Sequence, residues 1–211
     1  MQSRKILIAD DHFAIRSGIR SILMGEITDI EFGEATNATE LFQKVRSEVW
    51  DALILDVNLP DKNGLEILKQ IKSESISVPV LVFSMYSEEQ IAVRALRAGA
   101  AGYLCKAAAD QELGKAINLL LTGRKYITLS VAELLVSHFD ETSEKAAHEL
   151  LSDREYQTLT LIASGKSVSQ IAAELSLGVP TVSTYRTRIL EKMRLKNNAE
   201  ITHYVIANGL T

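Results

Sequence analysis

The stretch ALILDVNLP at residues 52–60 decides the fold. Its first four residues are apolar, as in a strand buried on both faces of a parallel sheet, and Asp56 follows the last of them. Three other apolar runs also end at polar residues that can carry chemistry. These runs are Lys5–Ala9, Val80–Phe83 and Gly102–Cys105, and the residues just past them are Asp10, Asp11, Ser84 and Lys106.

Amphipathic stretches alternate with these runs, and this alternation predicts a doubly wound parallel sheet with helices on both faces. In such a sheet, ligands bind outside the carboxyl ends of the strands, so the polar residues should share one crevice. The predicted helices are Phe13–Met24, Ala38–Val49, Leu65–Lys72, Glu88–Ala98 and Asp110–Leu121. We therefore predict an α/β domain over residues 1–125.

The predicted crevice would hold three carboxylates, one ammonium and one hydroxyl. Oxygen ligands of this kind suit Mg²⁺ rather than zinc. A carboxylate beside the metal could attack a phosphoryl group, with Lys106 and Ser84 on the phosphoryl oxygens. Taken singly, Asp11 has a second interpretation as the N-cap of the Phe13–Met24 helix.

This residue set resembles the receiver domain of two-component response regulators. The resemblance covers about the first 125 residues, and its motifs together are highly specific. It implies a flavodoxin-like fold with a five-stranded parallel sheet. The residues that carry it are the Asp10 and Asp11 pair, Asp56–Pro60 with Gly64 behind it, Ser84, Tyr103 and Lys106.

The resemblance implies a role for each residue of the crevice. Asp56 would accept a phosphoryl group from a sensor histidine kinase. Asp11, Asp56 and the backbone carbonyl of Asn58 would bind Mg²⁺, with Asp10 acting through water. Lys106 would contact the phosphoryl group. Ser84 and Tyr103 would form the switch pair, although Tyr103 could also be an aromatic residue that only packs at the end of the sheet.

Two residues depart from the receiver pattern. Ala107 follows Lys106, where many receivers have a proline whose cis bond aims the lysine. Met85 is bulkier than the small residue common beside the serine, and it could shield an acyl phosphate from water. We therefore expect slow autodephosphorylation.

Length and composition agree with two small cytoplasmic domains. A chain of 211 residues is long for one ordinary domain. It has no apolar run long enough for a membrane span, and its first residues lead into a strand rather than a signal peptide. We expect no membrane association. The lone Cys105 is predicted to be a buried thiol.

After a linker, the pattern changes to short helices. A helix over Ser130–Phe139 and the acidic stretch Asp140–Glu149 form the predicted linker, residues 126–149. Over residues 150–211, Ser152 and Glu155 form a capping box for a helix that ends near Gly165. A second helix, Gln170–Leu175, would be capped by Ser167 or Ser169. A third would begin at Gly178, with Pro180 in its first turn. This is a small all-α helix-turn-helix domain.

The third helix of this domain separates into two faces. Val182, Tyr185, Ile189 and Met193 recur at helical spacing and should pack inward. The outer face combines bases with short hydroxyl side chains, which let a helix approach a DNA groove. A solvated surface is the alternative interpretation. From Leu150 onward there are seven Lys and Arg residues against five acids, although the whole chain has a net charge of -4. The outer residues are Thr181, Ser183, Thr184, Thr187, Arg188 and Lys192.

This half resembles the helix-turn-helix output domain of the LuxR/NarL class. The resemblance implies a recognition helix over Val179–Met193, with Ser183, Thr184 and Thr187 at base-reading positions. It also implies that Ala199–Ala207 supports dimerisation on a roughly palindromic promoter site, and our candidates there are Ile201, Tyr204 and Val205. The residues that carry it are Leu151–Glu155, Gly165, Ile171, Ala172, Leu175, Thr181, Val182, Arg188 and Leu195.

Together the halves predict a transcription factor in which phosphorylation of Asp56 raises affinity for double-stranded promoter DNA. Two outputs stay open, namely release of the C-terminal helices and receiver dimerisation. RNA polymerase is a further candidate partner. Dimerisation would use the first and fifth helices of the receiver, where Ile15, Ile19, Ile117 and Leu121 are candidates if their faces are exposed.

Two other functions compete with this prediction. A metal-dependent phosphohydrolase would also use an aspartyl phosphate, but such enzymes commonly place an acid two residues after the nucleophile, where this chain has Asn58. We therefore expect no enzyme activity beyond self-phosphorylation from the kinase and self-dephosphorylation. The second competitor is a receiver that works by protein contacts alone, without phosphate.

Overall fold

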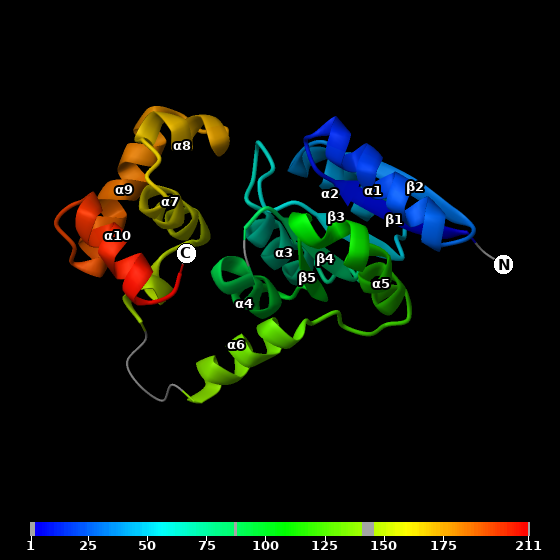
Figure 1. The fold of residues 1–211 in the computed structure, drawn as a ribbon. Coiled ribbons are helices and arrows are strands. Elements are labelled where there is room, and N and C mark those ends of the chain that lie inside the picture. Colours follow the sequence, from blue (N-terminus) through cyan, green and yellow to red (C-terminus); the bar gives the residue numbers. More distant parts are fainter. Residues whose placement is uncertain (1–2, 87, 141–145, 211) are drawn as a thin grey trace. The chain divides into compact units, whose positions relative to one another are not determined.

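The computed structural model describes residues 3–86, 88–140 and 146–210. The chain forms two compact units, Met1–Ala132 and Glu133–Thr211 (Figure 1). Each unit has its own buried core, and each is described separately below. No helix within the described ranges is long and apolar enough to cross a membrane.

The first unit is built on a parallel sheet of five strands in the order β2-β1-β3-β4-β5. The central strand β3 is fully buried, which confirms the interpretation of the apolar run at residues 52–55. The edge strand β2 has the sequence IEFGEA, and its residues alternate in exposure. The strands are β1 Arg4–Ala9, β2 Ile30–Ala35, β3 Ala52–Leu55, β4 Val80–Ser84 and β5 Gly102–Cys105.

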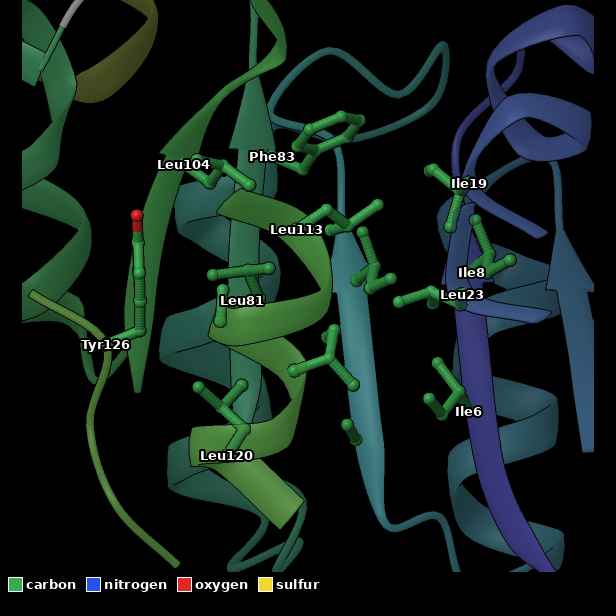
Figure 2. Packing of buried hydrophobic residues seen from close by; sticks show 14 residues of the cluster. Ile6, Ile8, Ile19, Leu23, Leu81, Phe83, Leu104, Leu113, Leu120 and Tyr126 are labelled. Carbon is green, nitrogen blue, oxygen red and sulfur yellow. The ribbon is translucent and has the colours of Figure 1, made fainter. Parts of the chain in front are cut away.

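Helices cover both faces of this sheet, as predicted. Helices α1 and α5 pack against each other over one face, where Ile8, Leu23, Leu81 and Leu113 belong to a continuous apolar core (Figure 2). Right-handed crossovers from this strand order place the other three helices on the opposite face. The helices are α1 Phe13–Glu26, α2 Ala38–Ser47, α3 Gly64–Ser73, α4 Glu88–Ala98 and α5 Ala109–Leu121, and a 3-10 turn, η1 Lys106–Ala108, precedes α5.

The first unit extends beyond the predicted boundary at residue 125. Tyr126 forms a parallel bridge with Gly102 and is 3% exposed, and its hydroxyl donates to Glu112 Oε2 at 3.0 Å. Burial of this ring ties the segment after α5 to the sheet (Figure 2). Helix α6 Leu129–Asp140 then begins within the first unit, which ends at Ala132.

The second unit consists of short helices, as predicted. Side-chain caps start three of them, with capping boxes at Ser152 and Ser167 and an N-cap at Asn197. Gly178 is the N-cap of α9, and Pro180 lies in its first turn. The elements are η2 Ala147–Leu150, α7 Asp153–Ala163, α8 Val168–Glu174, α9 Val179–Met193 and α10 Asn198–Ala207.

Part of the predicted acidic linker is folded. Residues 147–150 form the 3-10 turn η2, which packs on α9, and His148 Nδ1 lies 3.0 Å from the Tyr204 hydroxyl on α10. Residues 141–145 of the predicted linker lie outside the described residues. The folded second unit therefore begins before the predicted boundary at residue 150.

Candidate functional sites

The predicted crevice exists at the carboxyl ends of the strands of the first unit. Lys106 follows β5, and its Nζ lies 2.7 Å from Asp10 Oδ2 and 3.0 Å from Asp56 Oδ2. The three side chains are 7%, 2% and 5% exposed, respectively. Residues separated by up to 96 positions in the chain thus form one buried ionic group.

The ionisation of this group follows from burial and from its neighbours. Burial raises the pKa of Asp56, and the Asp10 carboxylate adds to this rise, whereas Lys106 and the backbone N–H of Asn58 act in the opposite direction. Burial alone would lower the pKa of Lys106, but Asp56 and Asp10 outweigh it, so that pKa is raised. Lys106 therefore remains an ammonium at neutral pH.

The site has the donors and the charge that a divalent cation requires. The site holds three carboxylates, from Asp10, Asp11 and Asp56, and one ammonium, from Lys106. It therefore has an excess of two negative charges. The Oδ1 atom of Asp11 is buried and has no hydrogen-bond partner within the part of the chain that the structure describes. A buried carboxylate oxygen without a donor is costly unless a cation satisfies it. The residues present therefore fit Mg²⁺, a hard cation that prefers oxygen ligands.

His12 is a further member of this cluster. Ligand atoms of Asp10, Asp11, His12 and Asp56 all lie within 4.8 Å of one another. Sequence reasoning missed His12, although its position next to two aspartates was a signal. The interpretation of Asp11 as a helix cap is wrong, because His12 is the N-cap of α1, and its backbone N–H donates to Asp10 Oδ1 at 2.8 Å.

The loop after Asp56 is held in place by backbone contacts. The backbone N–H of Asn58 donates to the Asp56 carboxylate, and Asn58 pairs with Asn63 in an antiparallel bridge. The N–H of Gly64 donates to the Val57 carbonyl at 2.8 Å. A Cβ at Gly64 would lie 2.7 Å from both the Asp56 carbonyl oxygen and Val57 Cα, so only glycine fits. The close approach of Gly64, at the start of α3, to Asp56 and Val57 holds the loop that carries Asn58.

The proposed switch residues lie inside the domain. Ser84 is fully buried, and its Oγ accepts a hydrogen bond from the Tyr86 N–H at 3.3 Å. Tyr103 is 1% exposed, and its hydroxyl donates to the Tyr86 carbonyl at 2.5 Å. The two side chains are thus connected through one backbone residue. The Lys106–Ala107 peptide is trans, yet Lys106 reaches both carboxylates.

The two predicted faces of α9 are observed. Val182, Ile189 and Met193 are buried, and Tyr185 is half-buried. Lys192 Nζ lies 2.6 Å from Oε2 of Glu155, which is itself buried. All six proposed DNA-contacting residues are exposed, namely Thr181, Ser183, Thr184, Thr187, Arg188 and Lys192.

Two of the proposed dimerisation residues on α10 need correction. Ile201 and Val205 are both 0% exposed, in a helix that packs against α7. They cannot contact a partner while the domain keeps its fold. Tyr204 is half-buried, with its hydroxyl at His148. A partner that docks on α10 must therefore use exposed side chains such as Ile206, which is 63% exposed.

The structure also shows how far the other apolar candidates of the first unit are buried. Ile19 and Ile117 belong to its core and are not exposed, while Ile15 and Leu121 are partly buried against it. Cys105 is half-buried rather than fully buried.

Two family models match the chain. Residues 6–118 match the response regulator receiver domain, and residues 149–205 match the bacterial regulatory proteins of the luxR family. The matched regions correspond to the two units described above.

Relatives match along almost the whole chain. The response regulator UvrY of Escherichia coli K12 is 32% identical over 97% of this chain and 94% of its own length. The response regulator GacA of Pseudomonas syringae pv. syringae is 32% identical, with 98% and 97% covered.

Solved structures of the response regulator RcsB, one of them from Salmonella enterica serovar Typhimurium, have a similar architecture. RcsB bound to the promoter rprA in the presence of the phosphomimetic BeF3- is 26% identical, with a TM-score of 0.64, and covers 96% of this chain and 98% of its own. A structure of two RcsB dimers bound to two parallel DNAs is 28% identical, with a TM-score of 0.59 and 97% and 98% covered. The pocket, the helix-turn-helix and these matches show that the chain belongs to the two-component response regulators with a LuxR-type DNA-binding domain.

Proposed function

We propose that this response regulator accepts a phosphoryl group on Asp56 from a sensor histidine kinase and, when phosphorylated, binds promoter DNA as a homodimer. The observation that carries this proposal is the buried contact of Lys106 with both Asp56 and Asp10 at the carboxyl end of the sheet. A carboxylate beside an ammonium and an unsatisfied carboxylate oxygen forms a site for phosphoryl transfer.

The residues of the pocket divide the chemistry among them. An Asp56 oxygen forms a bond to phosphorus as the bond from phosphorus to the kinase histidine nitrogen breaks, and that nitrogen keeps the electron pair. Lys106 neutralises charge on the phosphoryl oxygens, and the Ser84 hydroxyl donates to one of them. Asp11, Asp56 and the carbonyl of Asn58 would hold Mg²⁺, with Asp10 acting through water. When bound, Mg²⁺ supplies positive charge to the phosphoryl oxygens.

The DNA contact is assigned to the exposed face of α9. Arg188 and Lys192 would meet phosphates or guanine edges, and the hydroxyls of Ser183, Thr184 and Thr187 would allow close approach to the groove. The relative RcsB binds DNA as dimers, which supports the same assembly for this chain. Promoter binding would occur in the cytoplasm, where RNA polymerase is a candidate partner.

DNA binding at fixed salt tests this proposal. Purified protein is mixed with genomic DNA fragments, with and without a small phosphodonor plus Mg²⁺. We expect the phosphodonor to tighten selective binding by the wild type and to have no effect on Asp56→Ala. The matched control is Asp110→Asn, which changes an exposed aspartate of the same unit and should respond as the wild type does. Equal binding by all proteins under both conditions would show that Asp56 is not the control point.

A further inference from the structure

We propose that His12 is a ligand of the cation in the pocket and that its imidazole makes the site prefer a transition-metal cation such as Mn²⁺ to Mg²⁺. This inference rests on the proposed cation site and adds a ligand from the chain itself. The site so described has Asp11 and Asp56 as oxygen donors and His12 Nδ1 as a nitrogen donor.

The geometry that points to His12 is its contact with Asp11. His12 Nδ1 lies 2.8 Å from Asp11 Oδ1 and 3.3 Å from Asp10 Oδ1. The close Asp11 contact is nevertheless not a hydrogen bond, since Asp11 Oδ1 has no hydrogen-bond partner among the described residues. The nitrogen and the oxygen are therefore neighbours that do not satisfy each other.

Two ligands of one metal ion also lie close together without a hydrogen bond between them. With metal–ligand bonds of about 2.1 Å, adjacent ligands of an octahedron are separated by about 3.0 Å and opposite ones by about 4.2 Å. The 2.8 Å between His12 Nδ1 and Asp11 Oδ1 matches an adjacent pair.

The position of His12 leaves its ring free to take this role. Its side chain is 67% exposed, and although it is the N-cap of α1, it makes no capping hydrogen bond. The ring therefore has no structural function in α1 that would explain its place over the carboxylates.

The chemical consequence is a change in metal preference. Mg²⁺ prefers oxygen ligands and gains little from imidazole. Imidazole suits transition metals, whose affinity for a nitrogen-containing site rises along the first row from Mn²⁺ onward. Replacing one water with a nitrogen donor therefore favours Mn²⁺ over Mg²⁺.

The test compares the binding of Mn²⁺ alone and Mg²⁺ alone to the full chain by calorimetry. The ratio of the Kd for Mg²⁺ to the Kd for Mn²⁺ should fall by about tenfold or more in His12→Ala, on the scale of losses in metal affinity when a supporting residue is removed. A second variant, His12→Asn, keeps a polar residue suited to the N-cap and should lose the preference as well. His203→Ala, at an exposed histidine on α10, is the control and should keep the wild-type ratio.

Pulsed electron paramagnetic resonance of bound Mn²⁺ provides a direct readout. Protein with [15N]histidine should give a nitrogen modulation that differs from that of unlabelled protein, and His12→Ala should lose it. An unchanged Kd ratio, or a histidine modulation that persists in His12→Ala, would overturn the role of His12. If the wild type binds neither cation, the proposed cation site itself fails, and this inference fails with it.

Discussion

Replacing Lys106 with methionine should destabilise the first unit strongly. The ammonium is the partner of two buried carboxylates at 2.7 and 3.0 Å, and methionine would keep most of the volume but none of the charge. Removing one partner of a buried ion pair costs about 3–5 kcal/mol. That is a large share of the roughly 5–15 kcal/mol that stabilises an ordinary domain.

The single tryptophan makes the measurement specific to this unit. Trp50 is the only tryptophan of the chain and is 7% exposed, so its fluorescence reports on the unfolding of the first unit. With a urea slope of about 2 kcal/mol/M, the midpoint of Lys106→Met should fall by about 2 M. Added Mg²⁺ should recover part of the loss, because it offsets the same carboxylates.

The pH dependence of the stabilisation by Lys106 has a defined sign. The pKa of Lys106 is raised in the folded state, so its stabilisation is present below the ordinary lysine value of about 10.4 and is lost as the pH rises through the folded value. The wild type should therefore lose this advantage over Lys106→Met only in strongly alkaline solution. The pKa of Asp56 is also raised, so acidification protonates the carboxylate, and the deficit of the variant should shrink.

An exposed lysine provides the control for this experiment. Lys115 pairs with Glu112 at 3.0 Å, but its side chain is 64% exposed, so Lys115→Met should change the stability by less than about 1 kcal/mol. A loss of under 1 kcal/mol in Lys106→Met, or a loss that does not respond to Mg²⁺, would refute the reasoning.

Three further predictions follow from single contacts. Glu155→Gln should lower the stability of the second unit by about 1–2 kcal/mol, measured by far-ultraviolet circular dichroism, because the buried carboxylate meets Lys192 and the Ser152 N–H. Although burial opposes it, the Glu155 pKa is lowered, so this stabilisation is present above the ordinary glutamate pKa of about 4.3 and should be lost as the pH falls through the lower value of the folded state; an equal deficit at all pH values would contradict it. Gly64→Ala should cost about 1–3 kcal/mol by urea unfolding and slow phosphorylation of Asp56, because its Cβ would strike the backbone of Asp56 and Val57, and a neutral result would exclude that clash. Met85→Ala should shorten the lifetime of the phosphoprotein after acid quench, whereas an unchanged lifetime would exclude shielding by the exposed Met85.

The pocket could be predicted because parallel strands bring distant residues together in a regular way. Asp10, Asp56, Ser84 and Lys106 each follow an apolar run, and the topology fixes where such runs end. Strand β2 was not located, because this partly buried edge strand mixes polar and apolar residues and lacks the continuous apolar run of β3. His12 was missed because sequence adjacency does not show that a ring turns back over the preceding carboxylates.

Errors about interfaces have a different cause. Periodicity on α10 shows that Ile201 and Val205 share a face, but it does not tell whether that face meets α7 or a second chain. The boundary after residue 125 failed in a similar way. Tyr126 is buried because its backbone pairs with Gly102, more than twenty residues earlier, and a local sequence pattern does not show such a long-range contact.

The proposed switch residues are physically connected in a way that the proposed phosphorylation would use. The Ser84 hydroxyl is held by the Tyr86 N–H, and the Tyr103 hydroxyl donates to the carbonyl of the same residue. Phosphorylation replaces one carboxylate charge with a group of about two charges and several acceptor oxygens. Lys106 already contacts two carboxylates, so a further donor is required, and the Ser84 hydroxyl at the end of β4 is the candidate. Moving that hydroxyl disturbs the Tyr86 backbone, and a disturbed Tyr86 changes the acceptor that keeps the Tyr103 ring inside the domain.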